Sequence, residues 1–124
     1  MVQLRSFYAP PGTVLLAVDD DDEATRGMVG LRAIDDATGE LRRLYVLPSH
    51  RSSGLGRRLI DRLIGDAAGA GIRRIVLSTL PSMHHALGLY RSMGFTEIAP
   101  YVAEPTAGVI YLALDVGTEP PRNG

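Results

Sequence analysis

Phosphate groups could bind at one short segment of the chain, Arg51-Ser52-Ser53-Gly54-Leu55-Gly56. A strand-like apolar run, Leu44 to Leu47, precedes the segment, and an amphipathic helical run follows it from Gly56 to Ala70. Glycine permits positive φ angles and a close approach of ligand to backbone. The N–H groups and the positive dipole end at the start of a helix attract anions. The segment therefore predicts a phosphate-binding loop, although a plain helix-initiating turn could use the same glycines.

Other reactive residue types occur without the spacing that their chemistry needs. The acidic run Asp19 to Glu23 lacks the glycine and the terminal glutamate of a calcium-binding EF-hand loop, which favours a solvated turn. His84 and His85 open a helical segment with no further ligands in view, and no metal site is predicted. Gly-x-Ser-x-Gly and cysteine are both absent, which argues against a serine or cysteine hydrolase.

The composition indicates one small globular domain. The chain has 124 residues, of which 45% are hydrophobic, enough for a single core. A net charge of -1 does not favour nucleic-acid or membrane partners, and no apolar run approaches the roughly 18–20 residues of a membrane span. No signal-peptide pattern is present, and the lack of cysteine fits a cytoplasmic location. We expect a single domain over residues 1–116 and a disordered tail at 117–124.

The apolar patterns predict the elements that would position the loop. The residues before Pro10 are expected to form the tail of a helix or an irregular arm. Strands are expected at Thr13 to Val18, Thr25 to Ile34, Glu40 to Val46, Arg74 to Leu80, Phe95 to Tyr101 and Val109 to Leu114. Helices are expected at Gly56 to Ala70 and at Met83 to Met93, the second capped by Ser82. Strand, helix and strand over about 40 residues predict a βαβ unit.

With this order of elements, the sequence resembles the GCN5-related N-acetyltransferase (GNAT) superfamily. The central motif of that family is Arg/Gln-x-x-Gly-x-Gly/Ala after a strand that ends in Val-x-Pro. Val46-Leu47-Pro48 and Arg51 to Gly56 match both parts, and Tyr90 followed by Gly94-Phe95 matches a second signature. The resemblance runs from Thr13 to Val116. It implies an α/β fold (α+β in some schemes) with a mixed, mostly antiparallel central sheet around a βαβ core that binds acetyl-CoA.

The sequence departs from the family pattern in two places. Family members carry a first strand and two helices before the hairpin that begins here at Thr13, and only about a dozen residues precede it. We therefore expect that strand and both helices to be missing. Because those helices wall the acceptor pocket in the family, a second subunit of a homodimer could supply a wall. Met83 stands where many members carry an asparagine that faces the cofactor.

The resemblance assigns roles to individual residues. The backbone of Leu44, Tyr45 and Val46 is expected to bind the pantetheine arm as an added strand and to polarise the thioester carbonyl. Tyr90 is expected to protonate the leaving thiolate, or else it is a core tyrosine with a satisfied hydroxyl. Glu40 corresponds to the base of histone-type relatives, or else it is a solvated glutamate near a turn. The pyrophosphate is expected to bind at Arg51, Ser52, Ser53, Gly54, Leu55, Gly56 and Arg57.

The function that the resemblance implies is acetyl-CoA-dependent N-acetyl transfer. A primary amine of a small molecule or peptide would attack the thioester directly in a ternary complex, and the sequence does not identify that amine. The alternative is a shortened relative that binds acyl-CoA without turnover, as a sensor or an interaction module. The missing front helices favour the alternative, whereas Tyr90 and the intact loop favour the enzyme.

Overall fold

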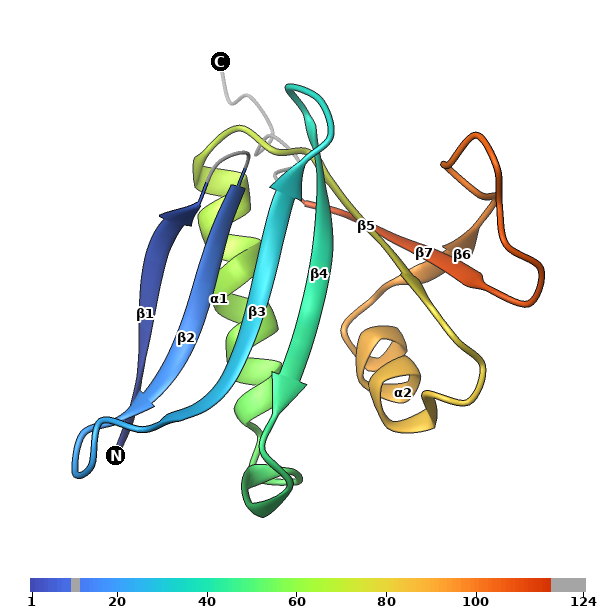
Figure 1. The fold of residues 1–124 in the computed structure, drawn as a ribbon. Coiled ribbons are helices and arrows are strands. Elements are labelled where there is room, and N and C mark those ends of the chain that lie inside the picture. The colour runs from blue at the N-terminus through green and yellow to red at the C-terminus, as the bar shows by residue number, and fades with distance from the viewer. Residues whose placement is uncertain (10–11, 117–124) are drawn as a thin grey trace, which may run out of the picture.

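Seven strands form one sheet in the order β1-β2-β3-β4-β5-β7-β6 (Figure 1). The computed structural model describes residues 1–9 and 12–116, so the tail predicted at 117–124 lies outside the described residues. All neighbouring strands are antiparallel except β4 and β5, which are parallel. The elements are β1 (Val2–Ala9), β2 (Gly12–Asp19), β3 (Thr25–Ala33), β4 (Thr38–Val46), a 3-10 turn (Pro48–His50), α1 (Leu55–Gly69), β5 (Arg74–Thr79), α2 (His84–Ser92), β6 (Thr96–Ile98) and β7 (Ile110–Asp115).

The first strand, β1, corrects the expectation of a helical tail or an irregular arm before Pro10. It pairs with β2 over its whole length, from Val2 opposite Asp19 to Ala9 opposite Gly12. Val2 and Leu4 pack against the core while the residues between them are exposed, which is the period of two of a half-buried strand. The expectation that the first strand is missing is therefore wrong. Only residues 10 and 11 separate β1 from β2, too few for a helix.

Two smaller expectations are also wrong. The second helix begins at His84 with Met83 as its N-cap residue, and neither Ser82 nor any other side chain caps it. The strand expected at Phe95 to Tyr101 is only the three-residue β6, because the chain leaves the sheet before Pro100, a residue that cannot donate to a strand ladder. Tyr101 consequently lies in the β6–β7 loop rather than in the sheet.

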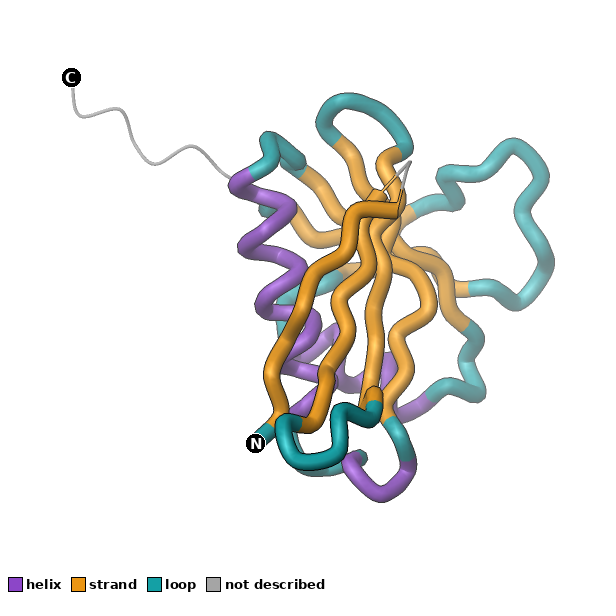
Figure 2. Tube along the Cα trace, turned by 60° about the vertical axis from the view of Figure 1, so that its left-hand side comes forward, coloured by secondary structure: helices purple, strands orange, loops and turns teal. Residues whose placement is uncertain are grey.

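The core lies between α1 and one face of the sheet. The buried residues of α1 recur at the spacing of one helix face, and α1 contacts β2, β3 and β4. Figure 2 shows this helix along one side of the sheet, and the opposite side of β1 to β4 carries no helix among the described residues. The buried face of α1 consists of Leu55, Leu59, Ile60, Leu63 and Ala67.

The two halves of the sheet separate between β4 and β5. These strands pair only where Thr38, Gly39 and Glu40 face Arg74, Ile75 and Val76. Beyond Glu40 the strands diverge, and Figure 1 shows β4 and β5 spreading apart on either side of α2. The edge of β4 that faces β5 therefore lacks a partner strand from Leu41 to Val46. This geometry confirms the predicted βαβ unit, in which α1 connects the two parallel strands.

Candidate functional site

A groove of about 480 Å³ opens where β4 and β5 diverge. Its walls come from the end of β4, the loop after β4, the first turn of α1 and the first turns of α2. The lining residues are Leu44, Tyr45, Val46, His50, Arg51, Ser52, Gly54, Gly56, Arg57, Ser82, Met83, His84, His85, Ala86 and Leu89. Two residues predicted to bind the pyrophosphate are not among the lining residues. Leu55 is buried in the core, and the Ser53 hydroxyl donates a hydrogen bond to the His50 carbonyl.

The loop before α1 presents backbone N–H groups to the groove. Ser52 and Gly54 both have positive φ, at 69° and 86°. The first helical hydrogen bond runs from the Arg58 N–H to the Gly54 carbonyl at 3.0 Å, and no side chain caps the helix. The N–H groups from Gly54 to Arg57 therefore have no backbone acceptor within the described residues. Unpaired donors at a helix start form a ready anion site.

The two glycines of the loop are required for different reasons. A Cβ atom on Gly54 would meet open space, so glycine is favoured at this position by its left-handed φ of 86° and not by close packing. A Cβ atom on Gly56 would lie 3.1 Å from Cδ2 of Leu89 and 3.8 Å from Cγ2 of Val46. Gly56 therefore allows α1 to approach α2 and β4 closely at the floor of the groove.

Two arginines of the groove are held in place by the protein itself. Arg51 donates from Nε to the Val46 carbonyl at 3.0 Å, and its guanidinium carbon lies 5.6 Å from the centre of the Tyr45 ring. Arg57 donates to the Ser92 hydroxyl at 2.8 Å and so ties α1 to α2. Since a guanidinium has five N–H donors, both side chains keep donors for an anionic ligand.

Tyr90, the predicted acid, is a buried residue of α2 and is not part of the groove lining. Only 6% of the residue is exposed, and its ring packs against Phe95 with centroids 5.7 Å apart. Burial raises the pKa of Tyr90 to about 12. Tyr90 therefore remains protonated at neutral pH. Its hydroxyl donates no hydrogen bond within the described residues.

Glu40, the predicted base, is also outside the groove lining and belongs to a different cluster. The Tyr101 hydroxyl donates to Glu40 Oε2 at 2.6 Å, while Arg42 and Arg32 lie 3.6 Å and 3.8 Å from Oε1. Burial, followed by the hydrogen bond to Glu40, raises the pKa of Tyr101 above its ordinary value. The Tyr101 ring also meets Tyr111 edge-on at 5.4 Å. Sequence reasoning missed Tyr101, because no local pattern connects a loop residue with a strand 61 positions earlier.

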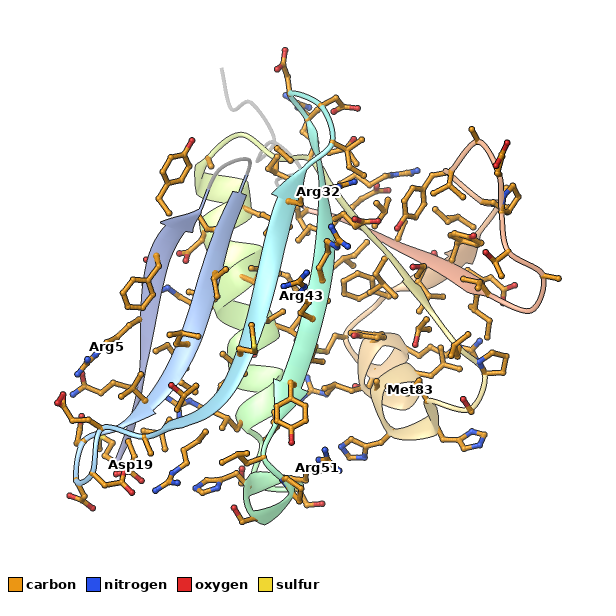
Figure 3. All side chains as sticks on the ribbon, in the orientation of Figure 1. Arg5, Asp19, Arg32, Arg43, Arg51 and Met83 are labelled. Carbon is orange, nitrogen blue, oxygen red and sulfur yellow. The ribbon has the colours of Figure 1, made fainter. Side chains whose placement is uncertain are left out.

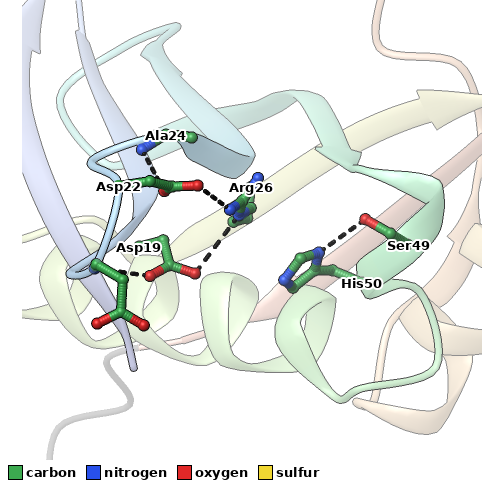
Figure 4. A network of polar contacts seen from close by, with 7 residues as sticks. Asp19, Asp22, Ala24, Arg26, Ser49 and His50 are labelled. Carbon is green, nitrogen blue, oxygen red and sulfur yellow. Dashed lines mark hydrogen bonds and ion pairs between the residues drawn. The ribbon is translucent and has the colours of Figure 1, made fainter.

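The acidic turn between β2 and β3 is stabilised by its own carboxylates (Figure 4). Asp19 accepts the Asp21 N–H at 2.9 Å, which is the main reason that the pKa of Asp19 is lowered. Arg26 lies 3.6 Å from Asp19 and 2.5 Å from Asp22. In the part of the chain that the structure describes, no group of three acidic or histidine side chains could hold a metal ion. The carboxylates of the turn thus bind its own N–H groups and Arg26.

Comparison with known proteins identifies the family. The model of the Acetyltransferase (GNAT) family matches residues 2–95 of the chain. The chain belongs to the GNAT acetyltransferase family. An uncharacterized N-acetyltransferase of Schizosaccharomyces pombe is 32% identical to it over 110 residues, which cover 88% of this chain and 68% of that protein. The chain spans only 35% and 30% of two other relatives, from Dictyostelium discoideum and Beutenbergia cavernae.

Solved structures share the fold. A Klebsiella pneumoniae structure superposes with a TM-score of 0.85 and 18% identity, covering 94% of this chain and 98% of that one. A GNAT family acetyltransferase from Elizabethkingia anophelis with acetyl-CoA bound gives a TM-score of 0.76 and 19% identity, covering 93% and 98%.

The expected fold class and membership of the N-acetyltransferase family are thus confirmed, as is acetyl-CoA, the acetyl donor that GNAT acetyltransferases use. Neither described helix has the length and apolar character needed to cross a membrane.

Proposed function

We propose that this GNAT domain transfers an acetyl group from acetyl-CoA to a primary amine, by direct attack of the amine in a ternary complex. The observation that carries the proposal is the continuous path of backbone donors and acceptors along the groove. The path begins at the unpaired edge of β4 and ends at the free N–H groups before α1. Such a path suits a long ligand with an extended amide-containing arm and a pyrophosphate end.

The residues of the donor side would act mainly through their backbone. The N–H groups from Gly54 to Arg57 would hold the pyrophosphate, with added charge from Arg51 and Arg57. The edge of β4 from Leu44 to Val46 would pair with the pantetheine arm as an extra strand. Acetyl-CoA supplies a thioester carbonyl, and a β4 N–H would stabilise the negative charge that develops on its oxygen.

Tyr90 would assist the departure of the thiolate. A thiol has a pKa of about 8.5, whereas that of Tyr90 is raised to about 12. Complete proton transfer from the phenol is therefore uphill by about 3–4 pKa units, or about 4–5 kcal/mol. Tyr90 consequently stabilises the leaving sulfur more readily as a hydrogen-bond donor than by giving up its proton.

Glu40 would receive the proton of the attacking ammonium through water. Four residues of strand between Glu40 and Leu44 cover about 13 Å, too far for direct transfer from an amine at the groove. Because Glu40 accepts a hydrogen bond from Tyr101 and is flanked by Arg32 and Arg42, its carboxylate has a fixed orientation. A water relay between the groove and Glu40 would complete the base function.

An alternative function is binding of acyl-CoA without turnover, as a sensor or an interaction module. It is favoured by one observation, that neither Tyr90 nor Glu40 lines the groove. Curated relatives have names as different as mycothiol acetyltransferase and IAA acetyltransferase, so the acceptor does not follow from similarity. A cytoplasmic location, a homodimer and the lack of nucleic-acid or membrane partners remain predictions.

Calorimetry with acetyl-CoA, followed by a thiol-release assay over a panel of primary amines, tests the proposal. Acetyl transfer predicts that acetyl-CoA binds and that at least one amine raises thiol release above the rate of hydrolysis. Acetyl-CoA binding with no amine-dependent release would refute transfer and support the binding module. Absence of acetyl-CoA binding would refute both functions.

A further inference from the structure

Two arginines flank a single carboxylate on β3 and β4, and a third arginine, Arg43, follows one of them in the chain. Arg42 and Arg32 lie 3.6 Å and 3.8 Å from the same Glu40 oxygen, and their side chains are 45% and 50% exposed. Arg43 has no hydrogen-bond or ion-pair partner among the described residues. Figure 3 shows Arg32 and Arg43 in front of these strands, with α1 behind the sheet. The cluster therefore has three guanidinium groups for one carboxylate, which we call the arginine cluster.

The nearest other acids do not neutralise the arginine cluster. Asp35 and Asp36 lie in the β3–β4 turn, where the Asp35 carboxylate accepts the N–H groups of Ala37 and Thr38 at 2.8 Å. Neither aspartate forms an ion pair with Arg32, Arg42 or Arg43 in the described part of the chain. An anionic ligand would therefore find an excess of positive charge at this place.

A β-bulge presents Arg42 and Arg43 together. Met28 faces Tyr45 and Gly30 faces Arg42, so β4 carries one extra residue opposite Val29. Arg43 has a φ of 56°, an uncommon conformation for a residue other than glycine. Regular strand alternation would turn one of two consecutive side chains toward the core, whereas both arginines here are exposed. Strained backbone that exposes a charged side chain often marks a functional site.

The arginine cluster adjoins the groove along the same strand. Leu44, Tyr45 and Val46 line the groove, and Arg43 directly precedes them. Glu40 is the last residue at which β4 still pairs with β5, so the cluster lies where the two strands begin to separate. Tyr101 reaches Glu40 from the β6–β7 loop and brings the second half of the molecule to the same place. The cluster thus lies just beyond the groove lining, on the side away from the phosphate loop.

We propose, on the basis of the acetyl transfer proposed above, that the acceptor is an amine that carries a carboxylate close to its amino group, as a free α-amino acid does. Arg42 and Arg43, aided by Arg32, bind the carboxylate, and Glu40 attracts the ammonium through the water relay proposed above. Guanidinium groups match a carboxylate in planar, two-pronged hydrogen bonds. A zwitterion complements both charges of the cluster, whereas a purely cationic amine meets three positive groups.

Matched acceptors test this assignment by thiol release. L-leucine, L-leucinamide and isoamylamine share one side chain and differ at the carboxylate. We expect the unmodified protein to favour L-leucine in kcat/KM by at least about tenfold over the other two, the range of a charge-assisted contact. In the double variant R42Q/R43Q, kcat/KM for L-leucine should fall by about 10- to 100-fold, with the KM for acetyl-CoA within about twofold. The loss for isoamylamine should be clearly smaller, because that amine loses only the contact by which Arg42 orients Glu40.

The matched control is R5Q. Arg5 lies on β1, opposite Leu16 of the same sheet, and is exposed without a partner among the described residues. R5Q should leave the preference for L-leucine intact. Equal use of the three acceptors by the unmodified protein would overturn the inference, as would an equal loss for all acceptors in R42Q/R43Q. Preference for a C-terminally amidated leucyl-aspartate peptide over L-leucine would overturn the proposal that the acceptor is a free amino acid. The carboxylate that is recognised would then belong to a peptide.

A binding measurement separates this inference from the transfer activity. Saturation-transfer NMR in the presence of coenzyme A compares N-acetyl-L-leucine with N-isoamylacetamide, which lacks the carboxylate. If no amine is acetylated but N-acetyl-L-leucine binds and R42Q/R43Q abolishes its binding, the carboxylate site stands and acetyl transfer fails. If amines are acetylated while neither probe depends on Arg42 and Arg43, acetyl transfer stands and the carboxylate site fails.

Discussion

The phosphate loop and the arginine cluster lie on the same two-part sheet but are built in different ways. The loop uses backbone N–H groups from consecutive residues, with Gly54 and Gly56 supplying the backbone freedom. The cluster uses side chains from β3, β4 and the β6–β7 loop, including the contact of Tyr101 with Glu40. A backbone site constrains its own sequence locally, whereas a side-chain site depends on how distant segments pack.

The largest effect is expected for Gly56→Glu on the donor side. The new side chain would crowd Leu89 and place a negative charge beside the proposed phosphates. We expect the affinity for acetyl-CoA to fall by about 100-fold, or about 2.8 kcal/mol, in a calorimetric titration.

Gly65→Glu is the matched control, because Gly65 lies on the same helix with open space around its Cβ position. It adds the same charge about two and a half turns away and should leave the affinity for acetyl-CoA within about twofold. Equal losses in the two variants would contradict a specific anion site at the start of α1.

The next effect concerns Tyr90→Phe, which removes the hydroxyl of a largely buried side chain that has no hydrogen-bond partner among the described residues. We expect kcat to fall by about 10- to 100-fold, below or near the usual range for an acid that transfers its proton fully. The affinity for acetyl-CoA should not change, and stability should remain within about 0.5 kcal/mol. Single-turnover kinetics measures the fall in rate, and urea unfolding measures the stability. An unchanged kcat would remove Tyr90 from the reaction.

Tyr101→Phe tests the hydrogen bond that Tyr101 donates to Glu40 beside the arginine cluster. It deletes the 2.6 Å hydrogen bond to Glu40 and leaves a half-buried carboxylate without its donor. We expect a loss of about 1–2 kcal/mol in the free energy of unfolding, measured in urea. The KM for the acceptor should rise while that for acetyl-CoA stays the same. Tyr8→Phe, at a residue 78% exposed, is the control and should leave both quantities unchanged.

The last effect is a loss of stability that appears only at alkaline pH. The pKa of Tyr90 is raised from 10.0 to about 12 in the folded protein, so the unfolded chain ionises first. The stabilisation is therefore complete below pH 10 and decreases by about 1.4 kcal/mol per pH unit as pH rises toward 12. Urea midpoints at pH 9.5, 10.5 and 11.5 should fall more steeply for the unmodified protein than for Tyr90→Phe. Parallel pH dependences would contradict the raised pKa.

The sequence predicted the loop before α1 and the helix that follows it, because their requirements are local. Val46-Leu47-Pro48, the two glycines and the apolar face of α1 are adjacent in the chain, and each indicates its own geometry. The splayed strands followed from the family pattern rather than from any residue. The bulge at Arg43 could not be predicted, since its cause is the register between β3 and β4.

Two errors came from weak local signals. β1 does carry a period of two, with Val2 and Leu4 alternating with Gln3 and Arg5, but the pattern is short and is obscured by Phe7 and Tyr8. Ser82 has the chemistry of an N-cap, yet α2 begins one residue later and leaves its hydroxyl outside the helix. Tyr101 illustrates a different limit, because only the packed tertiary structure brings it to Glu40.

The parallel ladder between β4 and β5 is only three residue pairs long, and a ladder this short favours local opening between the two strands. We expect strands β1 to β4 with α1 to behave as one unit, and β5 to β7 with α2 as a second, because the ladder between β4 and β5 is short. Opening between such units exposes amides to hydrogen exchange long before global unfolding. A ligand that spans the groove adds contacts to both units, and its binding energy raises the energy of that opening. Acetyl-CoA is thus expected to stabilise the fold as well as to react. Slower amide hydrogen exchange in β5 would reveal its binding.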